Sequence, residues 1–277
     1  MQKSKKIWII LILLIFAALA IFVLIKRPPI RVPLLQLPTA QLPSTPCSDG
    51  SCPSEIFDLT DWKLTLPITG PSNPNTPLEI DQPQLAKYDL SPWFTPTTDH
   101  KALLFRAAVN GTTTPNTAYA RSELREMTAN GTQDAAWPST SGTHTLFIDE
   151  AITAVPQNKP SVVVGQIHGD SSDTLVIRLD YPTLFVDRGA ANVFTLDNNY
   201  VLGKRFTVKF VATGGQIMVY YNGSTDPVYT LQKKIKKAYF KVGVYTQSNC
   251  ATEGSPDLCN NNNYGEVAVY QATVTHQ

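Results

Sequence analysis

The sequence predicts an all-β fold, a β-jelly-roll sandwich of two antiparallel sheets with a concave groove. Short runs of alternating or β-branched residues recur along the chain, and turn pairs such as Asn110-Gly111, Gly214-Gly215 and Asn222-Gly223 separate them. No window of a dozen residues has a helical period, and there is no internal repeat. About ten strands in roughly 220 residues favour one domain over two.

An apolar segment precedes this domain. Residues 7–25 are nineteen consecutive uncharged, apolar residues, and lysines or arginines flank them on both sides. Because this length spans a bilayer core, we expect 1–27 to be a signal anchor that tethers the rest of the chain at the cell surface. The alternative is a cleavable signal peptide, cut near Ala18-Leu19-Ala20, which would make the protein secreted. We expect no other contact with the membrane.

Residues 28–54 are the predicted linker, since prolines punctuate them without any apolar periodicity. The folded domain is expected over 55–277. It begins with a half-buried strand in which Trp62, Leu64 and Leu66 alternate with polar residues. Residues 68–100 are rich in Pro, Asn and Thr and are expected to be irregular. Further strands are expected at 102–109, 117–127, 143–153, 161–168, 174–180, 183–187, 205–212, 215–221, 238–247 and 265–274.

Four cysteines fall into two close pairs, Cys47 with Cys52 and Cys250 with Cys259. Two local disulfides are the natural interpretation, which agrees with export. A zinc site is the rival, but neither pair has the usual Cys-x2-Cys spacing or a neighbouring histidine. We therefore expect no metal.

The charge of the whole chain is +1, but six basic residues and one acidic residue lie before the folded domain. From Glu55 onward there are 17 basic and 21 acidic residues, a net charge of −4. Bulk charge therefore does not suggest nucleic acid as a partner, and any anionic ligand must be held by a local cluster.

Three predicted strands each combine a packing face with a face of long polar groups. In 118–127, Ala118, Ala120, Ser122 and Leu124 alternate with Tyr119, Arg121, Glu123 and Arg125. In 161–168, Val163, Gly165 and Ile167 are expected on the packing face and Gln166 and His168 on the other. In 239–247, Phe240, Val242 and Val244 alternate with Tyr239, Lys241, Tyr245 and Gln247. If the three strands lie in one curved sheet, their polar faces line a groove.

The groove would offer cations and amides that bind carboxylates, with one imidazole and one phenol that move protons. The sequence lacks the closely spaced acid pair of a jelly-roll glycosidase strand, the Gly-x-Ser-x-Gly elbow and any glycine-rich phosphate loop. The cations, amides and proton-transfer groups that remain suit a site for an anionic carbohydrate. His100, His144 and His276 fall outside these motifs and are expected to be surface or packing residues.

Arg121-Ser-Glu-Leu-Arg125, Gln166-Ile-His168 and Tyr239-Phe-Lys-Val-Gly-Val-Tyr-Thr-Gln247 resemble the three motifs of polysaccharide lyase family 7, the β-jelly-roll alginate lyases. The stretch Phe57 to Pro67 resembles the first strand of that family, so the similarity covers about 55–277. Ser122, Val242 and Thr246 depart from the commonest family residues, and none of them is a presumed catalytic group.

The resemblance implies a lyase that depolymerises alginate by β-elimination, removing the proton on C5 and cleaving the C4–O bond, without a cofactor. Arg121 and Gln166 would neutralise the substrate carboxylate, while His168 and Tyr245 would transfer protons. Glu123 would orient the arginines that flank it, Arg125 and Lys241 would bind carboxylates, and Tyr239 and Gln247 would be further subsite residues. Ile167 implies that guluronate-containing blocks are accepted. We expect a monomer.

Two alternatives stay open at this point. One is a lyase for another polyuronate such as glucuronan. The other is a non-catalytic module that binds acidic polysaccharide.

Overall fold

The computed structural model describes residues 52–277, apart from 72, 74, 171 and 190. The predicted anchor, most of the predicted linker and Cys47 lie outside the described residues. In the described part of the chain, no helix is both long and apolar enough to cross a bilayer.

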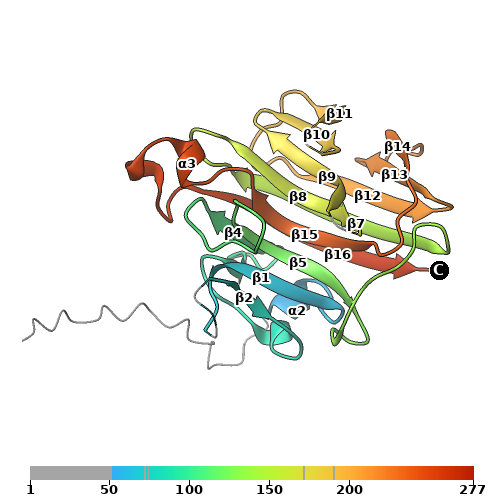
Figure 1. The fold of residues 1–277 in the computed structure, drawn as a ribbon, viewed down its shortest axis with the longest axis horizontal. Helices are drawn as coiled ribbons and strands as arrows, with labels where there is room; N and C mark the ends of the chain where they lie inside the picture. Colours follow the sequence, from blue (N-terminus) through green and yellow to red (C-terminus); the bar gives the residue numbers. More distant parts are fainter. Residues whose placement is uncertain (1–51, 72, 74, 171, 190) are drawn as a thin grey trace, which may run out of the picture. The chain divides into compact units, whose positions relative to one another are not determined.

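The described chain forms two antiparallel sheets, as predicted (Figure 1). We call the first the groove sheet; its nine strands are, in spatial order, β11 (Asn192–Asp197), β10 (Thr183–Asp187), β9 (Asp173–Asp180), β8 (Ser161–His168), β15 (Tyr239–Thr246), β5 (Arg121–Thr128), β1 (Trp62–Thr69) and β2 (Pro77–Ile80), with β6 (Gln133–Asp134) beside β5. We call the second the back sheet; it contains β14 (Tyr229–Gln232), β13 (Gln216–Tyr221), β12 (Phe206–Thr213), β7 (Thr143–Ala154), β16 (Tyr264–His276), β4 (Leu103–Ala108) and β3 (Phe94–Pro96).

Among the described residues, the helical segments are single turns: α2 (Pro53–Ile56), η1 (Leu85–Lys87), α3 (Cys250–Glu253) and η2 (Pro256–Leu258). The predicted Cys250–Cys259 disulfide is formed and joins α3 to the residue after η2.

The core lies between the two sheets and follows the period of two in the sequence. In β12, Phe206, Val208, Phe210 and Ala212 are buried while the residues between them are partly exposed. Strand β8 is different, because seven of its eight residues are buried. Its inner face contacts the core and its outer face forms the floor of a groove.

The expectation that residues 68–100 are irregular was wrong in two places, since β2 and β3 lie there. Strands β11 and β14 were also missed. All four lie at an edge of a sheet. Edge strands are short and bury little, so a run of three to six residues gives almost no alternating signal.

Candidate active site

A groove of about 600 Å³ lies on the outer face of the groove sheet, above β5, β8 and β15. Residues 114–119 form one wall, and Ser172 and Asp173 lie on the other side. Of the residues singled out from the sequence, those in its lining are Arg121, Arg125, Gln166, His168, Tyr239, Lys241 and Tyr245. The prediction that three distant strands share one groove is therefore confirmed.

The strand register explains why these side chains meet. Strand β15 lies between β5 and β8, and Tyr245 is directly opposite Arg121. Lys241 is opposite Arg125 on one side and Gln166 on the other. Since directly opposed residues on one face have Cβ atoms about 5 Å apart, the pairing alone assembles the floor of the groove.

Two β-bulges set which residues face the groove. In β8 the register with β9 shifts between Val163 and Gly165, so Val162 and Val164 point into the core and Val163 is directly opposite Tyr245. The expectation that Val163 lies on the packing face was wrong, because an extra residue in a bulge reverses the alternation. Gly165 does face inward, where a Cβ would come within 2.8 Å of the Ile148 Cδ1 atom.

The second bulge is in β15, where the register with β8 shifts between Val242 and Tyr245. Gly243 has a φ of +130°, and a Cβ at this position would lie 2.5 Å from the Ser122 carbonyl oxygen. Only glycine fits here without displacing β5. The predicted inward face of β15 is confirmed, since Phe240, Val242 and Val244 are all buried in the core.

Strand β5 begins at Arg121, not near residue 117 as predicted. Ala118 is exposed, because the chain before β5 forms the groove wall and not a strand. Tyr119 belongs to this wall.

Glu123 is the hub of the site. Its side chain is 2% exposed, and its Oε2 atom accepts hydrogen bonds from Arg121 Nη1 at 3.0 Å and from Lys241 Nζ. Its Oε1 atom accepts one from Gln166 Nε2. Burial alone would raise the pKa of Glu123, but Lys241 and Arg121 outweigh burial and lower it. One ionised carboxylate thus fixes three groups that face the groove.

Arg125, which Glu123 was also expected to orient, is held by other groups. Its guanidinium donates to the Glu126 carbonyl at 2.7 Å and forms an ion pair with Asp134 at 3.2 Å. It also lies over the Tyr239 ring, 4.1 Å from the centroid. The predicted Glu123–Arg125 contact was wrong, and Lys241 is the second cation that Glu123 binds.

Lys241 is buried on the groove floor. Burial lowers its pKa to about 8, and Arg121 and Arg125 act in the same direction, although Glu123 opposes them. At neutral pH the ammonium group is charged and already carries a carboxylate partner.

His168 has the hydrogen bonding expected of a neutral base. Its Nδ1 atom lies 3.0 Å from the Gly169 carbonyl oxygen, which can only accept, so Nδ1 carries the proton and Nε2 keeps a lone pair. Burial lowers the pKa of His168, and Lys241 adds to this, while the Gly169 carbonyl and Asp173 partly oppose it. The ring stacks on Tyr239 with centroids 4.8 Å apart.

Tyr245 is a protonated phenol at neutral pH. Burial raises its pKa, and Arg121 only partly offsets this although its guanidinium lies 4.0 Å from the ring centroid. In the free site, Tyr245 is therefore a proton donor. Gln247 lies one residue beyond β15, outside the groove lining, and its amide donates to the Thr246 carbonyl at 3.0 Å.

At the Tyr245 end of the groove, sequence reasoning placed Tyr119 on the polar face without giving it a role, and it missed Lys159. The Tyr119 ring lies edge-on to Tyr245 with centroids 6.3 Å apart, and Lys159 Nζ donates to the Tyr119 hydroxyl at 3.2 Å. The backbone N–H of Lys159 donates in turn to Glu253 of α3. These contacts join loops far apart in the sequence, so no local pattern indicates them.

The histidines outside the motifs lie away from the groove. His100 is exposed in a turn, and His144 stacks on Trp137 at 4.1 Å. His276 Nε2 is 2.8 Å from Glu126 Oε1, beside a separate cavity of about 550 Å³. Glu126 faces the interior of the sandwich, the side opposite the groove, because it follows Arg125 in a strand.

Comparison with known proteins gives a consistent result. The family model described as "Alginate lyase" matches residues 57–276. The structure of alginate lyase AlgAT5 from polysaccharide lyase family 7 is 46% identical, with a TM-score of 0.75, and the match covers 82% of this chain and 99% of that one. An alginate lyase from Corynebacterium sp. is 43% identical, with a TM-score of 0.77 and coverage of 83% and 100%. An alginate lyase from Klebsiella pneumoniae is 25% identical over 81% of this chain and 91% of its own length.

Proposed function

Because the chain belongs to the alginate lyase family, and is thus a polysaccharide lyase that acts on alginate, we propose that it cleaves by β-elimination at the groove centred on Arg121, Gln166, His168 and Tyr245. The observation that carries this proposal is that a neutral imidazole and a protonated phenol share a groove in which one buried carboxylate holds Arg121 and Lys241.

The proton on C5 of a uronate is a very weak acid, since its removal places charge on the adjacent carboxylate. Arg121 and Gln166 stabilise this charge, which is the largest single contribution in reactions of this type. Gln166 Nε2 has a second hydrogen free for the substrate, because Glu123 accepts only one. The hub therefore aims both groups before substrate binds.

His168 Nε2 takes the C5 proton, the C4–C5 double bond forms, and Tyr245 donates its proton to the leaving C4 oxygen. The raised pKa of Tyr245 favours this role of acid. For mannuronate, where proton and leaving group lie on the same side, Tyr245 serves as both base and acid. To act as a base, Tyr245 must first lose its proton. Arg121 alone does not lower the pKa of Tyr245 below its usual value, so this role requires a change in the charges around Tyr245 when substrate binds.

We further propose that guluronate-containing blocks are accepted. This rests on the family resemblance of Gln166-Ile167-His168 and on His168 as a base separate from Tyr245. Ile167 is fully buried in the core, so its effect is to set the positions of its two neighbours and not to touch substrate. The related alginate lyase A1-II′ was solved with a product designated GGG and with a substrate designated GGMG.

The test is ultraviolet absorbance of the unsaturated uronate formed from alginate, polymannuronate, polyguluronate and glucuronan. We expect product from alginate and from polyguluronate. Product from polymannuronate with none from polyguluronate would refute the guluronate proposal. Product from glucuronan with none from alginate would refute alginate as the substrate.

The protein is also proposed to act outside the cytoplasm, tethered by residues 7–25 or secreted. The apolar segment supports this, and so does the Cys250–Cys259 disulfide, a bond typical of oxidising compartments. Recovery of the full chain in the cytosolic fraction with both thiols free would contradict it.

A further inference from the structure

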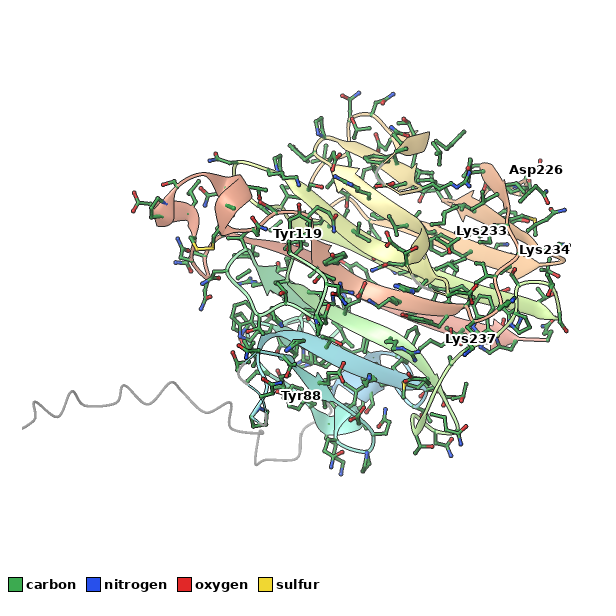
Figure 2. All side chains as sticks on the ribbon, in the orientation of Figure 1. Tyr88, Tyr119, Asp226, Lys233, Lys234 and Lys237 are labelled. Carbon is green, nitrogen blue, oxygen red and sulfur yellow. A yellow bond between two sulfur atoms is a disulfide. The ribbon has the colours of Figure 1, made fainter. Side chains whose placement is uncertain are left out.

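Four lysines flank one isoleucine in Lys233-Lys-Ile-Lys-Lys237, the segment between β14 and β15. Lys234, Lys236 and Lys237 are exposed and Lys233 is partly exposed. Across the described residues, none of these four ammonium groups forms an ion pair. Figure 2 shows Lys233, Lys234 and Lys237 together at one end of the domain, away from Tyr119. We call residues 233–237 the lysine platform.

The backbone of the platform is fixed. Ile235 is 2% exposed and packs in the core, and its N–H donates to Ser139 Oγ at 2.9 Å. The Lys233 N–H donates to the Gly215 carbonyl at 2.9 Å. The lysine side chains therefore project from an ordered support, which keeps their charges together.

The platform lies at one end of the catalytic groove. Lys237 is two residues before Tyr239, a distance of roughly 7 Å in extended chain. Asp170 is two residues after His168, the last residue of the neighbouring strand β8, and its Oδ1 atom accepts the Lys237 N–H at 2.8 Å. His168 and Tyr239 stack on each other, so the platform begins where the groove lining ends.

The platform is a local exception in a domain whose charge from residue 55 onward is −4. There are four positive charges in five residues there, and the carboxylate of Asp170 is occupied by the backbone N–H groups of Lys236 and Lys237. Charges within about 8–10 Å of one another interact at physiological ionic strength, so these lysines act on any polyanion leaving the groove.

We propose that the lysine platform is a second binding site, outside the groove, for the part of an acidic polysaccharide that extends beyond the catalytic subsites. A polyuronate carries one carboxylate per sugar, and a row of mobile ammonium groups on a rigid backbone attracts such a chain without selecting its sequence. This inference rests on the proposed function for the identity of the chain, but the charge recognition does not depend on cleavage.

The test compares the full-length protein with the triple variant Lys234→Gln/Lys236→Gln/Lys237→Gln. The matched control is Lys101→Gln/Lys204→Gln/Lys209→Gln, which removes the same charge from outside the groove lining. At low salt we expect the platform variant to raise KM for polymeric alginate about 10-fold with kcat unchanged, the lower end of electrostatic focusing effects. The KM of the control variant stays within about 2-fold of the native value. The difference disappears near 1 M salt, where the screening length is about 3 Å.

Tetrasaccharide cleavage is the second arm, because a chain that fills only the groove does not reach the platform. An equal rise of KM for tetrasaccharide and polymer, or an equal rise in the control, would overturn the proposal. Retention of each protein on immobilised polygalacturonate and on neutral dextran gives a readout without catalysis. Weaker retention of the platform variant on polygalacturonate alone supports the proposal even if alginate is not cleaved, and unchanged retention overturns it.

Discussion

Replacing Glu123 by glutamine tests the hub of the groove. The change keeps the size of the side chain but removes its charge, so Arg121 and Lys241 lose their shared partner and two amide groups face each other at Gln166. Breaking a buried ion pair by removing one member costs about 3–5 kcal/mol, since the remaining charge stays buried. At roughly 2–4 °C per kcal/mol for a domain of this size, the melting temperature falls by roughly 10 °C.

The pH profile gives a sharper test of the same variant. With Glu123 in place the pKa of Lys241 is about 8, because burial lowers it and Glu123 only partly offsets burial. Without Glu123, Lys241 loses its proton at a lower pH. If the charge of Lys241 is needed to hold the substrate carboxylate, the alkaline limb of kcat/KM lies near pH 8 in the native protein and moves to lower pH in Glu123→Gln.

The assays are thermal unfolding, urea unfolding and the rate of unsaturated product formation over a range of pH. Glu79→Gln is the control, because that carboxylate is 46% exposed in its pair with Lys63 and such pairs contribute about 1 kcal/mol or less. If both variants unfold at the same urea concentration and the alkaline limb stays in place, Glu123 is not the hub that the contacts indicate.

Four other variants, with one control, test three separate parts of the molecule. His168→Ala and Tyr245→Phe should each lower kcat by at least ~10²-fold, the scale of a positioned proton-transfer group, while Asp226→Asn on an exposed turn retains activity; full activity in both would place the chemistry elsewhere. Glu150→Met should raise the free energy of unfolding at pH 7 by about 1–3 kcal/mol, because both carboxyl oxygens of Glu150 are buried without a hydrogen bond in the described structure. Burial raises the pKa of Glu150 well above its usual value, so its folded form retains a proton that the unfolded chain releases; the gain should shrink toward pH 4, and a gain independent of pH would contradict this reasoning. Lys159→Met should lower kcat up to ~10-fold by releasing Tyr119 from its position beside Tyr245, whereas a purely structural lysine would change the melting temperature and leave kcat intact.

The fold was predictable where the alternation of apolar and polar residues is long. Strands β8 and β10 match their expected ranges, and β15 supplies the polar and apolar faces that its sequence indicates. Prediction failed at the edges of both sheets and at Val163, because neither a short edge strand nor a bulge leaves a period in the sequence.

The candidate site was predictable as a set of residues but not as a set of contacts. Alternation placed Arg121 and Glu123 on one face, but it did not indicate that Lys241 would take the place expected for Arg125 beside Glu123. That choice depends on how β15 pairs with β5, and cross-strand register is a property of the assembled sheet. The link from α3 through Lys159 to Tyr119 is likewise visible only in three dimensions.

The position of Glu123 predicts which molecules inhibit the enzyme. The carboxylate is a resident counter-anion: it occupies one side of Arg121 and Lys241 in the free protein, with its pKa lowered so that it stays ionised. A small organic acid must share these cations with an anion that cannot diffuse away, so acetate or free uronic acid should inhibit weakly. A polymer adds contacts along the whole groove. The site thus distinguishes a uronate within a chain from the same uronate free in solution.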